Sequence, residues 1–394
     1  MFYDVVILGA GPSGVMAAIT AKRLNAKLKI ALIEKNARIG KKLLSTGNGR
    51  CNLTNINQDS THYHSKNKWF TQQILQQFDL NETLAFFRSI GIETITEGEK
   101  VFPHSLQANS VLDLLRYALQ HDNIESICDF DCTSIRKDAD LFSLRSSDDR
   151  TVKTRKIVVA TGGNAAPQLG SSGDGYRFLK EFGHKVTTLY PSLVQVCTAG
   201  KKTIPLKGIK VNASVNVFDK DSLLSTEYGE VLFTEYGLSG PPIFQLSRYA
   251  SLVKEPVFKL DLFPQLSCDE LVALLEERAA LLPKELLLTG LLHNTVCREL
   301  LRELGENASS IQQLAELLKS WAFKVVSTRG WNSAQVTGGG VDLGDFSPLS
   351  LESKLVKNLY ACGEVLDVCG DCGGYNLQWA WSSGAVVGRA IAKE

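Results

Sequence analysis

The sequence has no excess of either charge and no long apolar run, and each absence excludes a class of protein. Its 394 residues include 43 basic and 42 acidic ones, for a formal net charge of +1. A global basic field for nucleic acid is therefore excluded, whereas a local basic face is not. No apolar run reaches the roughly 18 residues of a membrane-spanning helix. We also expect no signal peptide, because the first apolar run, residues 5–8, leads directly into a glycine motif.

The composition is otherwise that of an ordinary globular protein. Hydrophobic residues make up 44% and charged residues 22% of the chain, which excludes disorder as the main state. The nine cysteines are odd in number and scattered. We therefore expect reduced thiols and a cytoplasmic location. At roughly 150 residues per domain, the length predicts two or three domains.

Both ends of the chain have the pattern of a doubly wound α/β domain. Residues 3–8 and 29–34 are apolar runs typical of buried strands, and the Ala-rich residues 12–25 between them are periodic like a helix. This order is the βαβ unit of a parallel sheet. Two further buried strands that run into glycine are expected over 156–163 and 359–364. A helix over 377–393 closes the chain.

The pattern of the sequence changes at Ser192, where the middle part of the chain begins. We expect strands over 211–218, 231–234 and 257–263, then helices over about 267–282, 284–304 and 310–322. Ser267 and Glu270 have the spacing of a capping box at the start of the first helix. The predicted organisation is a first domain over 1–191, an insert over 192–326 that is β-rich to 266 and helical from 267, and a second segment of the first domain over 327–394.

The first motif, residues 9–14, has the form G-x-G-x-x-G between a strand and a helix. Gly9 permits a tight turn, Gly11 lets the backbone approach a pyrophosphate, and Gly14 lets helix and strand pack closely. The helix N-terminus adds partial positive charge for the phosphates. Glu34 lies twenty positions after Gly14, where it can bind an adenosine ribose and repel a 2′-phosphate. These residues predict a dinucleotide site that disfavours NADP.

A second motif near the C-terminus identifies the dinucleotide. Glu364 ends a strand, and Gly373 and Gly374 open the last helix. An acidic residue at a strand end can hold ribityl hydroxyls. A glycine pair at a helix N-terminus can bring N–H groups to the pyrimidine edge of a flavin. The pairing predicts FAD, and it places both ends of the chain in one domain.

With these motifs in place, the chain resembles the BaiN/RdsA (YhiN-type) family of NAD(P)/FAD-dependent flavoproteins. The segments that carry the resemblance are residues 40–55, 160–163, 170–176, 233–241, 337–341, 352–354, 363–367 and 373–380. They span nearly the whole chain. The resemblance implies an α/β fold: a Rossmann-type FAD-binding domain interrupted by an insert with a β-barrel-like part and a helical part.

The motifs and the resemblance together define a set of expected cofactor residues. They are Gly9, Gly11, Pro12, Ser13, Gly14, Glu34, Lys35, Lys42, Gly49, Arg50, Cys51, Asn52, Thr161, Gly162, Gly163, Gly339, Gly363, Glu364, Gly373, Gly374, Tyr375 and Asn376. Arg50 can balance phosphate or substrate charge and favour a Cys51 thiolate. Cys51 is therefore a candidate proton donor, with a buried structural thiol as the alternative. Tyr375 or a bound water is the other candidate donor.

Other polar groups leave alternatives open. Cys369 and Cys372 form a C-x-x-C pair with three interpretations: a redox pair, half of a zinc site, or two inert thiols. No second ligand pair is evident, so we expect no metal. His62 and His64 fit a solvated loop better than a metal site. Glu235 replaces the histidine usual in the family and puts an acid/base role there in doubt.

The resemblance implies an enzyme that contains FAD and moves hydride equivalents. NAD(P)H is the expected transient donor, without a Rossmann domain of its own. The expected reaction is reduction of a carbon–carbon double bond, of uridine in ribosomal RNA or of a small unsaturated molecule. An oxygen-using amine oxidase and a non-catalytic flavin- or RNA-binding module remain as alternatives. Lys201, Lys202, Lys207 and Lys210 are a candidate RNA patch or a solvated loop, and no stable protein partner can be inferred.

Overall fold

The computed structural model describes residues 1–305 and 310–393, and it divides into two units. The first unit combines Met1–Tyr190 with Val336–Glu394, and the second is the inserted segment Pro191–Gln335. The insert therefore extends beyond the expected boundary at residue 326. The reason is that the strand Trp321–Thr328 pairs with strands of the insert, so the part expected to be helical up to 326 ends in a strand.

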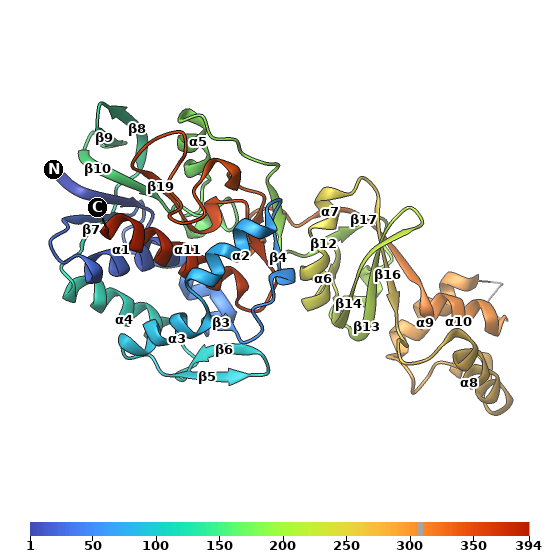
Figure 1. Cartoon of the computed structure of the whole chain (residues 1–394). Helices are drawn as coiled ribbons and strands as arrows, with labels where there is room; N and C mark the ends of the chain where they lie inside the picture. The colour runs from blue at the N-terminus through green and yellow to red at the C-terminus, as the bar shows by residue number, and fades with distance from the viewer. Residues whose placement is uncertain (306–309, 394) are drawn as a thin grey trace. The chain divides into compact units, whose positions relative to one another are not determined.

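The first unit is built on a seven-stranded sheet of order β7-β2-β1-β10-β9-β8, with β19 also beside β10 (Figure 1). Its strands are β1 (Phe2–Leu8), β2 (Ile30–Ile33), β7 (Glu125–Ile127), β8 (Cys132–Asp138), β9 (Leu141–Ser146), β10 (Thr151–Val159) and β19 (Leu359–Ala361). Strands β7, β2, β1, β10 and β19 are parallel, and β8 and β9 are an antiparallel addition. The central parallel strands β1, β2, β10 and β19 end in buried apolar runs, because both faces of such a sheet are buried.

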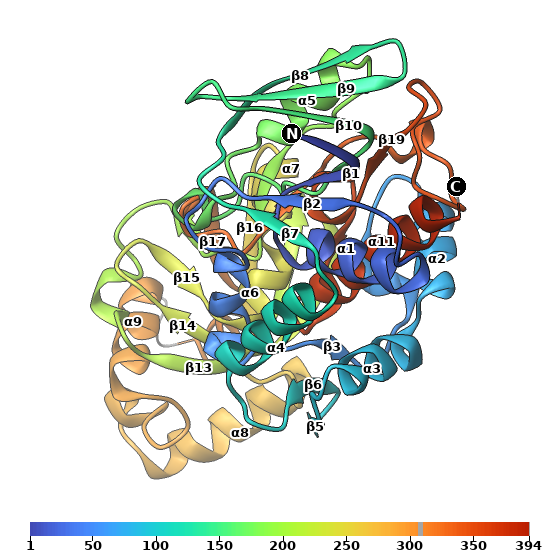
Figure 2. The same cartoon turned by 90° about the vertical axis from the view of Figure 1, so that its left-hand side faces the viewer.

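Two glycine-containing helices lie side by side in the first unit (Figures 1 and 2). They are α1 (Pro12–Leu24) and α11 (Tyr375–Ala392). A Cβ added at Gly384 of α11 would lie 2.4 Å from the Ser13 carbonyl oxygen, and one added at Gly388 would lie 2.8 Å from that of Ala17. Glycine at these two positions lets the backbones touch. The two helix N-termini are thereby fixed relative to each other.

The remaining elements of the first unit are further helices and short strands. The α-helices are α2 (Lys68–Gln77), α3 (Leu80–Ser89), α4 (Ala108–His121) and α5 (Asp174–Glu181), and the strands are β3 (Thr54–Asn55), β4 (Tyr63–His64), β5 (Thr94–Glu97), β6 (Lys100–Pro103), β18 (Val336–Gly338) and β20 (Cys369–Gly370). The 3-10 turns are η1 (Lys41–Gly49), η2 (Ser60–His62), η3 (Pro167–Leu169), η7 (Leu343–Asp345) and η8 (Gly363–Val365). Asn67 and Asp79 begin α2 and α3 as side-chain caps of the first free N–H groups.

The second unit contains a closed barrel of order β12-β15-β14-β13-β16-β17. Its strands are β12 (Val196–Thr198), β13 (Lys210–Asp219), β14 (Ser222–Phe233), β15 (Gly237–Ser239), β16 (Pro256–Asp261) and β17 (Trp321–Thr328), and β11 (Tyr190–Ser192) precedes them. Burial alternates along β13 and β17, as a barrel with a filled interior requires. The rings of Phe233, Trp321 and Phe323 pack against one another at tilted and edge-on angles within that interior.

Helices complete the second unit. They are α6 (Pro241–Leu246), α7 (Tyr249–Leu252), α8 (Cys268–Leu281), α9 (Asn294–Leu304) and α10 (Ile311–Lys319), with η4 (Ile204–Leu206) and η5 (Lys284–Leu286) as 3-10 turns. The capping box at the start of α8 is present, because Ser267 and Glu270 bond each other's backbone N–H groups. The helix expected over 284–304 is wrong in its first half. Gly290 has a φ of +84° there, and a left-handed residue interrupts a helix.

Within the described residues, no helix is long and apolar enough to cross a membrane. No disulfide joins any of the nine cysteines, all of which lie in the described part of the chain.

The contact between α1 and α11 should be sensitive to any side chain at Gly384. We predict that Gly384→Val lowers the free energy of unfolding by about 2 kcal/mol or more, because overpacking displaces backbone rather than a flexible side chain. Ala392→Val, at the partly exposed end of the same helix, should change it by less than about 0.5 kcal/mol. Urea unfolding of both variants measures the difference, and equal stabilities would contradict the close contact.

Candidate cofactor and active site

The parallel strands of the first unit end at one edge of the sheet, and motif residues follow each end. Gly9 follows β1, Glu34 follows β2, Thr161 lies two residues after β10, and Glu364 lies three residues after β19. In open α/β sheets, ligands bind outside the carboxyl ends of the strands. The two sequence motifs therefore meet at one place, although 350 residues separate Glu364 from Gly14.

Three glycines of the first motif have three different surroundings. Gly9 has a φ of +108°, and a Cβ there would lie 2.3 Å from the Ala160 carbonyl oxygen. A Cβ at Gly14 would lie 2.0 Å from the Gly9 carbonyl oxygen. A Cβ at Gly11 meets no protein atom within 4 Å. Packing within the protein explains glycine at Gly9 and Gly14, whereas Gly11 lines the cavity and leaves room for the close approach of a ligand.

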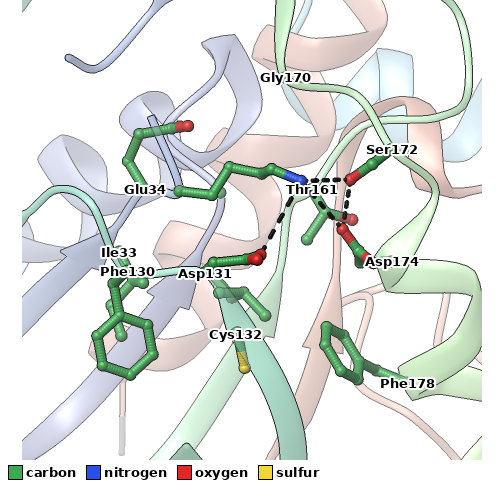
Figure 3. Close-up of a pocket in the computed structure, with 13 residues that line it drawn as sticks. Ile33, Glu34, Phe130, Asp131, Cys132, Thr161, Gly170, Ser172, Asp174 and Phe178 are labelled. Carbon is green, nitrogen blue, oxygen red and sulfur yellow. Dashed lines mark hydrogen bonds and ion pairs between the residues drawn. The ribbon is translucent and has the colours of Figure 1, made fainter. Parts of the chain in front are cut away.

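A cavity brings together many of the expected cofactor residues. It is lined by Gly9, Ala10, Gly11, Pro12, Ser13, Glu34, Asn36, Gly40, Lys41, Lys42, Ala160, Thr161, Gly162, Leu169, Gly170, Ser171 and Glu364. An adjoining cavity adds Lys35, Phe130, Asp131, Cys132, Ser172, Asp174 and Phe178 (Figure 3). Asn36, Lys41 and Ser171 were not among the expected cofactor residues, although Lys41 and Ser171 lie in segments that carry the family resemblance.

Glu34 is held in place by backbone groups. One carboxylate oxygen accepts from the Ala10 N–H at 3.2 Å, and the other accepts from the Asn36 N–H at 2.9 Å. Close by, the Lys35 ammonium donates to the Ser172 hydroxyl at 2.8 Å and lies 3.5 Å from Asp174. Ser172 and Asp174 line the cavity of Figure 3. Glu34 therefore presents a fixed acceptor where an adenosine ribose is expected.

Glu364 forms a second fixed acceptor at the other motif. One oxygen pairs with the Lys42 ammonium at 2.9 Å, and the other accepts from the Thr337 N–H at 2.8 Å. The Thr337 hydroxyl in turn accepts from the Asn164 N–H at 2.8 Å. Gly163 packs tightly beside it, since an added Cβ would lie 2.2 Å from the Thr337 hydroxyl. Thr337 belongs to a glycine-rich segment of the sequence, but its contact with Glu364 could not be predicted.

One buried polar atom of the cavity lining fits a cofactor. The Thr161 hydroxyl has no hydrogen-bond partner in the described part of the chain. Buried polar groups in proteins are normally paired. Together with the open space at Gly11, this atom matches a dinucleotide whose own polar groups complete the pair. The Asn52 side-chain oxygen is also unpaired, but Asn52 lines neither cavity. Gly339, by contrast, packs against backbone, since an added Cβ would lie 2.1 Å from the Thr188 carbonyl oxygen. Gly339 does not line the cavity.

The loop of η1 does not have the expected electrostatics. The Arg50 guanidinium pairs with Glu97 at 2.8 Å and stacks on Phe102 at 4.3 Å. Cys51 is fully buried, and this burial raises the pKa of its thiol to about 12. The expected thiolate favoured by Arg50 is therefore wrong. Gly49 faces open space, with its nearest contact at 4.0 Å.

The N-terminus of α11 follows two glycines in the left-handed region. Gly373 has a φ of +135° and Gly374 a φ of +104°, and a Cβ at Gly374 would lie 2.6 Å from the Thr54 carbonyl. The Asn376 side chain closes the turn through two bonds to Gly370, at 2.7 and 2.8 Å. Burial, with nearby acidic groups, raises the pKa of Tyr375 to about 12. The tight turn thus depends on both glycines.

The histidine pair is linked to this turn. The Asp371 carboxylate accepts from His62 Nδ1 at 3.0 Å and from His64 Nε2 at 2.7 Å. The His62 ring stacks on Tyr375 at 4.4 Å. The side chains of His62 and His64 are only 30% and 24% exposed, so the expected solvated loop is wrong. Among the described residues, no group of three or more metal-binding side chains is found.

Most lysines of the candidate RNA patch are neutralised. Three ion pairs account for them: Lys202 with Glu303 at 2.7 Å, Lys207 with Glu235 at 2.5 Å, and Lys210 with Glu230 at 2.8 Å. Lys207 also holds the pKa of Glu235 below its usual value. These charges form surface pairs and do not form a continuous basic face.

The sheet, the glycine turn and the two fixed carboxylates define a Rossmann-type FAD-binding oxidoreductase. The family model named HI0933-like protein Rossmann domain matches residues 3–390. The chain therefore belongs to the HI0933-like family, and the resemblance seen in its motifs is confirmed.

Relatives with assigned names match over almost the full length. The 3-dehydro-bile acid delta(4,6)-reductase of Clostridium scindens is 35% identical over 403 residues, or 98% of both chains. The ribosomal RNA dihydrouridine synthase of Escherichia coli K12 is 32% identical over 399 residues, or 97% of this chain and 96% of the relative. A quinol–fumarate reductase structure aligns with all of this chain and 71% of its own, with a TM-score of 0.54 and 16% identity, which shows the fold alone.

A direct test of the cofactor turn is a side chain at Gly11. We predict that Gly11→Val folds normally, because an added Cβ meets no protein atom, but loses FAD because the branched side chain occupies the pyrophosphate path. The unfolding free energy of the apoprotein should stay within about 0.5 kcal/mol of the wild type. Bound flavin is measured from the absorbance of the purified protein. The flavin content of Gly11→Ala should lie between those of the wild type and Gly11→Val. Full flavin occupancy in Gly11→Val would contradict this placement.

The buried thiol of Cys51 should be unreactive. A pKa of about 12 leaves almost no thiolate at pH 8, and the thiolate is the nucleophile. We expect iodoacetamide to alkylate Cys51 at least about tenfold more slowly than the partly exposed Cys197 or Cys268 in the native protein, as measured by peptide mass spectrometry. The difference should vanish in guanidinium. Rapid labelling of native Cys51 would restore the thiolate hypothesis.

Proposed function

We propose that the protein uses NAD(P)H to reduce a carbon–carbon double bond conjugated to a carbonyl group, through bound FAD. The observation that carries the proposal is the match to two kinds of reductase over nearly the whole chain. Their names imply substrates that share one chemistry. A 3-oxo steroid unsaturated at C4 and uridine both have a double bond conjugated to a carbonyl.

Features of the site support a role for FAD as the resident redox group. Glu34 and Glu364 are fixed acceptors at the two motifs, and Lys42 lies beside Glu364 at 2.9 Å. The bound flavin would supply the hydride. The sequence has no second G-x-G-x-x-G motif between a strand and a helix, so the nicotinamide donor would visit the flavin without a Rossmann domain of its own.

Between the two substrate classes, we favour a small molecule. Identity is 35% to the bile acid reductase against 32% and 27% to the two ribosomal RNA enzymes. The ion pairs of Lys202, Lys207 and Lys210 also remove most of the candidate phosphate contacts. RNA reduction remains an outcome of the test.

The experiment measures oxidation of the reduced flavin without oxygen. Holoprotein reduced by NADH or NADPH is mixed with a 3-oxo-Δ4 steroid acid, with its saturated counterpart as matched control, or with unmodified ribosomal RNA. We expect the oxidised-flavin spectrum to return with the unsaturated steroid alone, and the product to gain two hydrogens. If ribosomal RNA alone restored the oxidised-flavin spectrum, the substrate would be RNA and not a small molecule.

The two alternative functions, an amine oxidase and a non-catalytic module, predict different results in the same experiment. An amine oxidase would be reduced by an amine and oxidised only by oxygen. A non-catalytic module would stay reduced with every acceptor. Either result would contradict the proposal.

A further inference from the structure

Asn55, in the short strand β3, is bonded to the glycine turn that precedes α11. Its side-chain nitrogen Nδ2 donates to the Gly373 carbonyl oxygen at 3.0 Å, and both residues are buried. A Cβ added at Gly374 would lie 2.6 Å from the Thr54 carbonyl, so the strand and the turn also touch through their backbones. The turn at the flavin end of the site therefore has a partner 318 positions away in the sequence.

The neighbouring residue of β3 bonds the helix itself. The Thr54 hydroxyl donates to Gln378 Oε1, in the first turn of α11, at 2.6 Å. The bonds between Asn376 and Gly370 close the turn from within. The two residues of β3 thus make separate contacts, in which Thr54 holds the helix and Asn55 holds the turn before it.

The orientation of the Asn55 amide is fixed by its two partners. The Asn57 backbone N–H, which can only donate, faces Asn55 Oδ1 at 2.9 Å. The Gly373 carbonyl, which can only accept, faces Asn55 Nδ2. A flipped amide would lose both bonds, so the side chain has one arrangement. The Gln58 side chain holds the strand in turn, because it donates to the Asn55 carbonyl at 2.7 Å.

The bond from Asn55 sets the direction of the peptide group that joins Gly373 to Gly374. In a trans peptide, the C=O and the N–H point to opposite sides. Because Asn55 holds the Gly373 carbonyl on the side of β3, the Gly374 N–H points away from β3. Both glycines have φ values in the left-handed region, and glycine gives the backbone more freedom to turn than any other residue. An outside bond is therefore needed to keep this peptide group in one direction.

We propose that Asn55 is a positioning residue that keeps the Gly374 N–H directed at the pyrimidine edge of the bound flavin and so raises the midpoint potential of the flavin. A donor fixed at that edge stabilises the negative charge of the reduced flavin more than it stabilises the oxidised flavin. Asn55 acts through the peptide group and not by contact with the flavin. This inference rests on the bound FAD of the proposed function but not on the substrate.

The test measures the midpoint potential of the flavin in holoprotein, without any substrate. Asn55→Leu keeps the approximate size of the side chain but has no donor. We expect this variant to retain FAD and to favour the reduced flavin about tenfold less than the wild type does, the effect of losing one hydrogen bond to a charged group. For a two-electron couple, this tenfold change lowers the midpoint potential by about 30 mV.

Thr54→Val is the matched control. It removes the bond to Gln378 from the adjacent buried position and leaves the bond between Asn55 and Gly373 in place. We expect both variants to lower the urea midpoint of unfolding, because each leaves a buried polar group without its partner. Only Asn55→Leu should lower the potential. A merely structural role of Asn55 would change stability and leave the potential at its wild-type value.

Asn55→Ala is the second variant, for use where the branched leucine side chain prevents folding. A wild-type potential in either flavin-loaded Asn55 variant would overturn the proposal, and so would an equal fall in Thr54→Val. Loss of FAD from both Asn55 variants would make Asn55 a requirement for binding and would also overturn it. Absence of flavin from the wild type would overturn the FAD site together with this inference. Failure of every conjugated acceptor, with the potentials as expected, would contradict the proposed reaction alone.

Discussion

The backbone contact between α1 and α11 is the constraint on which the site depends. At Gly384 of α11, an added Cβ would lie only 2.4 Å from the Ser13 carbonyl oxygen of α1. Trp379 donates to the Gly363 carbonyl at 3.0 Å, and Ser383 accepts from the Gly363 N–H at 2.9 Å. The last helix is thereby fixed to the end of β19 as well as to the first helix. One site can therefore draw on the first and last parts of the chain.

This constraint also explains why a long insert is tolerated. The parallel strands β2, β1, β10 and β19 come from outside the inserted segment, and the barrel has a separate core around Phe233 and Trp321. Each unit buries its own apolar residues. The residues that fit FAD all belong to the first unit.

The sequence predicts local features with a fixed period or spacing. The glycine turn, Glu34, Glu364 and the capping box at Ser267 all depend on neighbours within a short stretch of chain. It could not predict long-range partners. Glu97 neutralises Arg50 from a distant hairpin, and that pairing removes the expected effect on Cys51. The bond from the Thr337 N–H to Glu364 likewise joins positions more than twenty residues apart. Gly290 lies in a Leu-rich stretch whose pattern is typical of a helix, but its φ of +84° interrupts the helix there.

The central claim is that the N-terminus of α1 holds the pyrophosphate of one FAD molecule and the N-terminus of α11 holds its flavin end. A crystal structure of the FAD complex tests this most directly. The account predicts the pyrophosphate against the backbone of Gly11 to Ser13, the adenosine ribose on Glu34, and the pyrimidine edge of the flavin at Gly373 and Gly374. A flavin bound in the reverse direction, or away from Gly373 and Gly374, would contradict it.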